Sequence, residues 1–420
     1  MFNKIICVFV CICGLLTLSA CGDDINVSDT TVNEPVGAEA PLSPITFQEE
    51  IVDIPVAKET RISFVAVGDN IPHDSVLNTA KADAQGNEKY NFSKIYAGVK
   101  ADIEKADIAF INQESPVGGE SLGISGYPSF NAPNEMIEDL IDVGFDVFNI
   151  ANNHMYDKKL KGYTNTVDYF NSLPITMIGG YTKNDYDNVR IVEEQGIKIA
   201  FLSYVTFVNG LNTGGTIGNG DYIIPFADTD DITRQVAIAK EQADMVIVSF
   251  HWGTEYKYTA DNTQKKYAKL CADLGVDAII GHHPHVVGDV EWLEGESGNK
   301  TLVAYSIGNF CSSQLYSYSM VGEMLKFDIV KDKDGVVSIE NVLVDPVVCH
   351  YKTDTSKKDN QNLDVRYEVR MYMMRDYTEA LANSHGSQNW ARFSFDTLKG
   401  YISGSNYADV ADEFLPDFMK

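Results

Sequence analysis

The sequence has few cysteines that could stabilise a folded domain. Of seven cysteines in 420 residues, four lie within the first 21 positions, which leaves Cys271, Cys311 and Cys349. Three thiols so widely spaced exclude a disulfide framework and a four-cysteine zinc site.

Basic residues are also scarce. The chain carries 33 Lys and Arg against 60 Asp and Glu, a formal net charge of −27. Such a field repels nucleic acid, for which the sequence has no binding motif either, so we expect no nucleic-acid partner. An anionic substrate would need a local positive centre, which bound metal ions could supply.

The apolar run from Ile5 to Leu18 is too short for an ordinary membrane span. Residues 1–20 instead have the pattern of a secretion signal, with Lys4 before the apolar run. The run ends in Leu18-Ser19-Ala20-Cys21, which resembles a bacterial lipobox with Cys21 as the lipidated residue. A signal peptide with an incidental cysteine is the alternative. Residues 21–60 are acidic and predict a flexible tether, so we expect an extracytoplasmic lipoprotein anchored to the cell membrane.

Beyond residue 60 the chain has the composition of a globular protein, in which short apolar runs alternate with amphipathic stretches. The strand-like runs are Ile62–Val67, Ile108–Asn112, Val147–Ala151, Ile197–Tyr204, Met245–Phe250, Ala278–Gly281 and Leu302–Ile307. The helical patterns include 134–143, 162–173 and 262–274. This alternation predicts an α/β fold, followed by a hairpin turning at 331–335.

Two further segments carry no motif. Residues 210–221 form a polar, glycine-rich loop, which either borders a site or is a tolerated surface insertion. The last stretch, 352–420, is polar and is predicted to be a helical extension.

Five clusters of polar residues each follow directly after a predicted strand. They contain Asp69, then Asn112 and Glu114, then Asn153 and His154, then His251 and Trp252, and finally His282, His283 and His285. In open α/β sheets the loops leaving the carboxyl ends of strands gather at one edge, so residues distant in sequence can meet there.

Taken singly, each cluster has an ordinary structural interpretation, as a helix cap, a turn or a hydrogen-bonded histidine. The sequence His283-Pro284-His285 is more specific, because proline fixes the backbone between two imidazoles that can address adjacent positions of a metal centre. Mixed Asp, Glu, Asn and His ligands favour divalent ions such as Mn, Fe or Zn.

In this order the clusters resemble the metallophosphoesterase pattern, and more closely the CapA family of poly-γ-glutamate capsule synthesis. The resemblance covers residues 61–351 and rests on GDNIPHDSV, NQESP, NNHMYD, HWGTEY, GHHPHVV and YSIGNF. It implies a four-layer α/β/β/α sandwich of metallophosphoesterase type with the metal site at the mouth of the two sheets.

The resemblance also implies a role for each residue at a matching position. Asp69 and His285 would bind a first metal ion, and Asn153, His251 and His283 a second, with Glu114 bridging the two. His154 would be catalytic, protonating a leaving oxygen without binding metal.

The sequence departs from the family pattern at two ligand positions. Phosphoesterases usually carry a histidine where this chain has Ile71, and an aspartate where it has Glu114. His73 lies four residues after Asp69 and could turn back to supply the missing imidazole or a hydrogen bond; alternatively, it is a helix-start residue exposed to water.

Other residues are expected to contact substrate or to support the ligands. Asp157 is assigned to a supporting or turn position. Trp252 and Glu255 could line a pocket, although packing is the more common role of such an aromatic residue. Asn309 and Gln314 follow the strand at 302–307 and suit hydrogen bonds to a ligand, as does Asn112, whereas His282 is expected to be structural.

Three functions remain open at this point. The first is a metal-dependent hydrolase acting on a phosphoester, or on an amide of an envelope or capsule polymer. The second is a non-catalytic tethered component of a capsule synthesis and export complex, which would bind other proteins of that complex and an anionic polymer. The third is an envelope lipoprotein with vestigial motifs.

Overall fold

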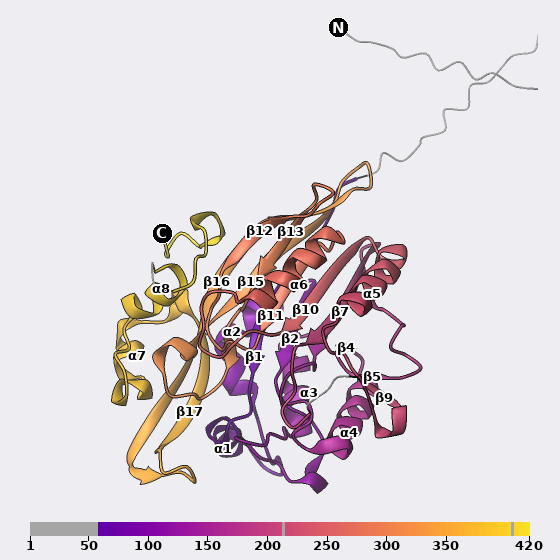
Figure 1. Ribbon diagram of the computed structural model, residues 1–420. Coiled ribbons are helices and arrows are strands. Elements are labelled where there is room, and N and C mark those ends of the chain that lie inside the picture. The colour runs from indigo at the N-terminus through magenta and orange to yellow at the C-terminus, as the bar shows by residue number, and fades with distance from the viewer. Residues whose placement is uncertain (1–57, 212–214, 405–406) are drawn as a thin grey trace, which may run out of the picture. The chain divides into compact units, whose positions relative to one another are not determined.

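The computed structural model describes residues 58–211, 215–404 and 407–420. The predicted signal peptide, Cys21 and all but the last residues of the predicted tether lie outside this range. The described residues belong to one compact unit, Val56–Lys420, built around two large β-sheets and a small one (Figure 1).

The largest sheet has eight strands. Its order is β17-β16-β15-β1-β2-β3-β4, with β14 paired to the end of β1. Strands β1 to β4 run parallel, whereas β15, β16 and β17 continue the sheet in antiparallel fashion. The bounds are β1 Thr60–Asn70, β2 Ile108–Gln113, β3 Val147–Asn149, β4 Thr176–Ile178, β14 Asn309–Cys311, β15 Val321–Lys331, β16 Val337–Lys358 and β17 Asp364–Met373.

The second sheet has six strands in the order β12-β13-β11-β10-β7-β6. Its four central strands are parallel and the two edge strands antiparallel. The bounds are β6 Arg190–Glu194, β7 Ile197–Val205, β10 Met245–His251, β11 Ala278–His282, β12 Val290–Glu294 and β13 Lys300–Ala304. The buried central strands are rich in Ile and Val, as expected for parallel strands covered on both faces.

Helices pack against both sheets. The bounds are α1 Asp74–Asp83, α2 Ser93–Ile103, α3 Asn134–Val143, α4 Lys159–Asn171, α5 Thr229–Gln242, α6 Asn262–Asp273, α7 Glu379–Ser384 and α8 Phe395–Ser403. Helices α1 and α2 contact β17 of the large sheet, while α5 contacts β7 and β10, and α6 contacts β12 and β13 of the second sheet.

The core has two parts. The first part includes the contact between the two large sheets, where Phe64 of β1 stacks on Phe201 of β7 with ring centroids 6.3 Å apart. The other lies between the second sheet and its helices, around the fully buried Trp252. The expected α/β fold is therefore confirmed, as is the hairpin, since β15 and β16 are antiparallel neighbours joined at 332–336.

Two segments differ from the sequence-based expectation. Part of the 210–221 loop forms β8 Gly215–Ile217, which pairs with β9 Tyr222–Ile224 and, through it, with β5 Tyr181–Thr182. The expected helical extension from residue 352 is wrong for its first third, because β16 continues to Lys358 and β17 joins the sheet edge. The alternating apolar residues of β17 favour a strand because they are buried against α1 and α2, and this burial outweighs local helix propensity.

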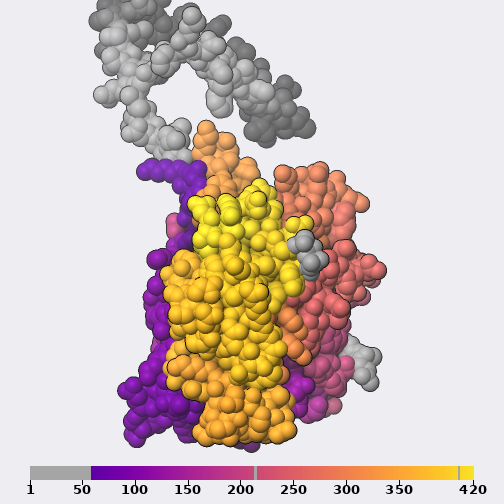
Figure 2. Space-filling view, turned by 90° about the vertical axis from the view of Figure 1, so that its left-hand side faces the viewer, coloured from indigo at the N-terminus to yellow at the C-terminus, as the bar shows by residue number. Residues whose placement is uncertain are grey.

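The C-terminal residues cover much of one face of the described unit. In Figure 2 the orange and yellow residues, from β16 onward, fill most of the surface that faces the viewer.

Among the described helices, none has the length and apolar character needed to cross a membrane.

Candidate metal centre and its surroundings

The polar clusters do converge, because they lie at the carboxyl ends of parallel strands in both sheets. Asp69 is next to last in β1, and Glu114 directly follows β2. His251 is the last residue of β10, while His283 and His285 follow β11. The two sheets meet here, since the backbone N–H of His283 donates to Oδ2 of Asp69 at 3.3 Å.

Two groups of side chains have the spacing of metal ligands. One comprises Glu114, His251 and His283, and the other Asp69, Glu114 and His285. Within each group the ligand atoms lie within 4.8 Å of one another, and all five residues are buried. Glu114 is common to both, which is the geometry of a carboxylate that bridges two ions.

Unsatisfied atoms in these groups test whether an ion fits. Both carboxylate oxygens of Glu114 are buried without a hydrogen-bond partner in the described residues, as are Nδ1 of His251 and Nδ1 of His283. Burying unpaired polar atoms costs about 1–3 kcal/mol each. A divalent ion would satisfy the Glu114 oxygens, and oxygen with imidazole nitrogen suits Mn, Fe or Zn, so the residues present fit such a group.

Asn153 lies beside the second group. Its Oδ1 is 3.0 Å from Nε2 of His251, and the same nitrogen is 3.8 Å from Oε1 of Glu114. These three atoms face one another, so an ion among them would replace the Asn153–His251 hydrogen bond with direct coordination by both side chains.

Burial dominates the electrostatics of the centre. Burial and the charge of Asp69 raise the pKa of Glu114 well above its usual range. Burial acts in the same direction on Asp69, but the imidazoles of His282 and His285 outweigh it and hold the pKa of Asp69 well below its usual value.

The histidines of the second group are held in the neutral form. Burial, then the neighbouring His285, lowers the pKa of His283 to about 3. Burial, then the neighbouring His283, lowers the pKa of His251 well below its usual value. Neutral imidazoles keep the lone pair that a metal ion needs.

The turn that carries His283 and His285 is conformationally unusual. Their φ angles are 98° and 58°, in the left-handed region that non-glycine residues rarely adopt. Packing by the surrounding residues must sustain this backbone strain. The strained conformation points both imidazoles at the acidic residues. Nδ1 of His285 lies 3.1 Å from Oδ2 of Asp69 and 3.0 Å from Oδ1 of Asn309.

A buried hydrogen-bonded chain holds Asp69 in place. Nδ2 of Asn112 donates to Oδ1 of Asp69 at 2.7 Å, and Nδ2 of Asn149 donates to Oδ1 of Asn112 at 2.8 Å. Asn149 also donates a hydrogen bond to Ser249 and accepts one from Ser203, both in the second sheet. Asn112 therefore supports a ligand rather than reaching substrate.

His154 and Asp157 form a pair at the edge of the centre. Nδ1 of His154 lies 2.8 Å from Oδ2 of Asp157, which also accepts from the backbone N–H of Phe130 at 2.8 Å. Phe130 packs edge-on against the imidazole, with centroids 4.6 Å apart. Asp157 thus fixes the ring and leaves Nε2 as the free nitrogen. His154 is in neither ligand group.

His73 does not join the ligand groups found in the described residues. It is half-buried, its Nδ1 accepts from the backbone N–H of Ser313 at 3.4 Å, and its ring packs edge-on against Phe130. Burial, followed by the charge of Arg366, lowers its pKa well below the usual value. His73 directly precedes α1, as expected of a helix-start residue, but it is half-buried rather than exposed to water.

The other predicted residues are divided between the site and the core. Trp252 is fully buried, stacks on Phe250 and donates to the backbone oxygen of Tyr305, so its role is packing. Asn309 supports His285, and Gln314 accepts a hydrogen bond from Asn309 at 3.1 Å. His282 is buried with Nδ1 3.5 Å from Asp69 and stacks near Phe110.

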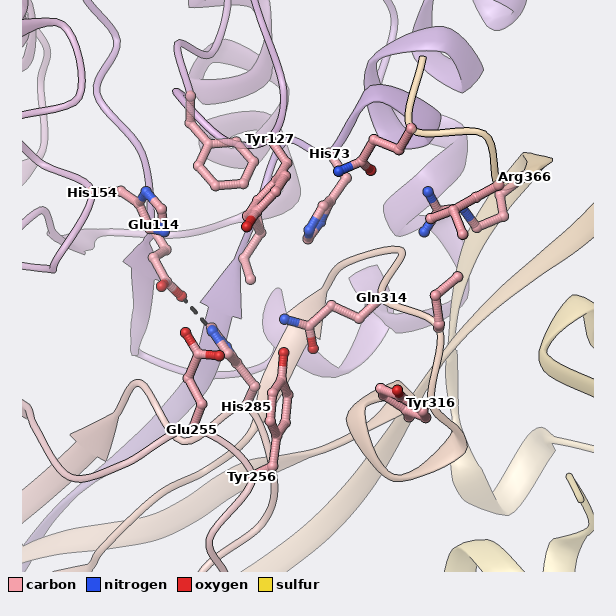
Figure 3. Close-up of a pocket in the computed structure, with 15 residues that line it drawn as sticks. His73, Glu114, Tyr127, His154, Glu255, Tyr256, His285, Gln314, Tyr316 and Arg366 are labelled. Atoms are coloured by element: carbon pink, nitrogen blue, oxygen red, sulfur yellow. Dashed lines mark ion pairs between the residues drawn. The ribbon is translucent and has the colours of Figure 1, made fainter. Parts of the chain in front are cut away.

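Two cavities open on the centre. One, of about 260 Å³, is lined by Glu114 and His285 on one side and by His73 and Arg366 on the other (Figure 3). The second, of about 620 Å³, reaches His283 and Asn153. Tyr127, His154 and Glu255 line both, so they stand between the cavities, at the metal centre.

Three contributors were missed from the sequence. Asn149 lies inside β3, and Tyr127 and Arg366 lie in segments without a recognised motif. For Arg366 a signal existed in the alternating pattern of 364–373, which is typical of a strand.

Comparison with known proteins finds a match that contains every residue of the two ligand groups. Residues 63–314 match the model of a family described as bacterial capsule synthesis protein PGA_cap. The PGA biosynthesis protein CapA of Bacillus subtilis (strain 168) is 31% identical over 229 residues, covering 54% of this chain and 57% of that protein. The capsule biosynthesis protein CapA of Bacillus anthracis is 27% identical over 268 residues, covering 60% and 61%. The match thus spans about three fifths of the length of each relative.

Two solved structures resemble the chain weakly. Haemophilus influenzae NAD nucleotidase (NadN) has a TM-score of 0.42 at 12% identity and covers 74% of this chain and 54% of that one. TT1561 of Thermus thermophilus has a TM-score of 0.34 at 12% identity, covering 67% and 99%. Neither likeness bears on the chemistry of the site.

Proposed function

Because the chain belongs to the bacterial capsule synthesis protein (PGA_cap) family, we propose that it is a metal-dependent hydrolase acting on a polymer of the cell envelope or capsule. The observation that carries this proposal is Glu114, whose two unpaired oxygens are shared by two ligand groups beside the His154–Asp157 pair. A site kept for structure alone would not need an oriented imidazole facing the open cavities.

The proposal includes the architecture. We assign the two large sheets and their flanking helices to a four-layer α/β/β/α sandwich of metallophosphoesterase type, with two divalent ions held at the mouth of the sheets. Asp69, Glu114 and His285 would hold one ion, and Glu114, Asn153, His251 and His283 the other.

Two divalent ions would supply positive charge that activates an attacking water and polarises the carbonyl or phosphoryl oxygen of the bond to be cleaved. The protein's own contribution is positioning and proton transfer. Asp157 keeps the ring of His154 oriented through Nδ1, and His154 lines both cavities. In the protonated form His154 donates to the leaving group and becomes neutral, and Asp157 stabilises the imidazolium before transfer.

The descriptions of the relatives support a proposal for the substrate class. The proteins of Bacillus are described as acting in PGA and capsule biosynthesis, and the family description names capsule synthesis. We therefore assign an anionic capsule polymer of the poly-γ-glutamate type as substrate. The acidic protein would hold such a polymer only through local positive charge, which the ions supply.

Purified full-length chain should shorten a γ-linked glutamate polymer when supplied with Mn²⁺ or Zn²⁺ and should stop when a chelator removes the ion. A phosphodiester chromogen in parallel separates amide from ester hydrolysis, and chain length is followed by gel filtration. If the metal-loaded chain turns over neither, hydrolase activity is refuted.

A second candidate is a non-catalytic component that binds capsule polymer for a synthesis or export complex. Ile71 favours it, since this buried apolar side chain stands where phosphoesterases usually have a histidine, leaving the group of Asp69, Glu114 and His285 with three protein ligands. Metal-dependent binding of polymer without turnover, in the experiment above, is the result that this candidate predicts.

We also propose that Cys21 is lipidated and that the chain is anchored outside the cytoplasm. Replacing Cys21→Ser should move the protein from the membrane fraction to the soluble extracytoplasmic fraction or leave it unprocessed, because a lipid would be the main attachment of this domain. Fractionation with immunodetection measures the distribution. Identical membrane retention of Cys21→Ser and wild type would rule out lipid attachment at this residue.

A further inference from the structure

The C-terminal segment contributes a cation to the wall of the cavity at the metal centre. Arg366 lies in β17, beyond residue 314 where the family match ends. Its side chain is only 7% exposed and lines the smaller cavity together with Glu114 and His285. Figure 3 shows its guanidinium on the side of the cavity opposite His154, beyond His73.

A bulge in β17 turns Arg366 inward. The pairing of β16 with β17 shifts between His350 and Lys352, and Glu368 has a φ of 51°. A bulge reverses which residues face inward, so Val369 and Met371 are buried after it while Arg366 is buried before it.

Arg366 keeps hydrogen-bond donors that the described residues do not use. One Nη donates to Oδ2 of Asp359 at 3.1 Å, and the other donates to the backbone oxygen of Ser313. Its Nε–H has no acceptor among the described residues. It is also the only Arg or Lys among the described residues that line this cavity. A guanidinium has five N–H donors in a planar fork, so donors remain for an anion after these two contacts.

Amide groups lie on the same wall. Gln314 points into the cavity in Figure 3, and because its Oε1 accepts from Asn309, its amide NH₂ remains as a donor. Gln361 lines the cavity as well. One cation with neighbouring amide donors is a combination suited to a carboxylate next to an amide bond.

Building on the proposed function, we propose that Arg366 and Gln314 form a subsite for a carboxylate carried by the substrate chain close to the bond that is cleaved. In a γ-linked glutamate chain every repeat carries one free carboxylate, so a chain lying across the metal centre presents one to this wall. The subsite recognises the carboxylate charge, and the C-terminal segment thereby sets the substrate class.

Calorimetric titration tests the proposed subsite. The full chain, both metal-loaded and chelator-treated, is titrated with a short γ-linked glutamate oligomer. The matched ligand is the same oligomer with its side carboxylates converted to amides. Arg366→Gln should weaken binding of the acidic oligomer by about tenfold or more, because a charge-assisted hydrogen bond is lost, while binding of the amidated oligomer should not change. Inorganic phosphate, as a third ligand, reports whether any anion is accepted.

Asp359→Asn is the decisive second variant. It keeps the acceptor oxygen for the turn at 359–363 and removes the carboxylate that competes for Arg366. The subsite predicts tighter binding of the acidic oligomer by this variant. A merely structural ion pair predicts lower thermal stability in both variants and no change in affinity, which would overturn the proposal.

Each failure can be told apart from failure of the proposed function. Binding that depends on Arg366 without any metal-dependent turnover refutes the hydrolase and leaves the subsite standing. Turnover of the polymer that is unaffected by Arg366→Gln and Asp359→Asn refutes the subsite alone. If Arg366→Gln does not fold, Asp359→Asn and Arg366→Lys still decide, since Arg366→Lys keeps the charge but loses the planar fork.

Discussion

Glu114→Gln should reduce bound metal to near zero at both ligand groups and abolish any hydrolysis. Glu114 is the one residue common to both groups, and an amide offers a single weak oxygen donor where the carboxylate offers two. Metal content after dialysis, measured by elemental analysis, is the readout. Glu255→Gln is the matched control, since Glu255 lines both cavities but belongs to neither group, and it should keep its metal.

Without metal, Glu114→Gln should differ from wild type in how its stability depends on pH. The pKa of Glu114 in the folded chain is raised above its ordinary value of 4.5 by burial and by Asp69. The folded state thus holds this proton more tightly than the unfolded state, so stability is present below pH 4.5 and is lost as pH rises through the folded pKa. Chelator-treated wild type should therefore lose stability relative to Glu114→Gln as pH rises above 4.5.

Thermal unfolding of both proteins across this range measures the difference. Metal should reverse the order at neutral pH, stabilising wild type but not Glu114→Gln. If the variant retains metal, or if the two proteins show parallel pH profiles, Glu114 is not the bridging carboxylate.

His154→Ala should lower the rate of hydrolysis by about 10²–10⁴ while leaving bound metal at the wild-type level, because a general acid contributes a factor of this size. His283→Ala is the counterpart and should lose metal as well as activity, since His283 belongs to a ligand group. Metal content and turnover are measured on the same preparations.

Asp157→Asn should give a rate of hydrolysis between those of wild type and His154→Ala, because an amide can still contact Nδ1 but cannot stabilise the imidazolium. Loss of metal from His154→Ala as complete as that from His283→Ala would refute the assignment of His154 to proton transfer.

The positions of the ligand residues could be predicted because they depend on local pattern and a general rule. Asp69, Glu114 and His251 each stand at the end of an apolar run, and parallel strands deliver such ends to one edge. The sequence did not show that the two sheets face each other so closely that His283 donates to Asp69. That contact depends on packing across residues far apart in the chain.

Other parts of the site could not be read from the chain. The spacing of His73 from Asp69 indicates a possible replacement ligand, but the fold places His73 beside Ser313 and Phe130 instead. Arg366 was hidden by two effects. Its segment was expected to be helical, and a bulge shifts the alternation that would have indicated which residues face inward.

The ligand residues are distributed from Asp69 to His285 and come from both large sheets. No continuous stretch of the growing chain contains a complete ligand group until residue 283 has been made, and long-range pairings of this kind form late in folding. Binding of a metal ion to these groups would therefore be coupled to the final docking of the two sheets. A chain exported in the unfolded state would acquire its ions from the compartment in which it folds, so the metal supply on that side of the membrane would decide which ion it carries.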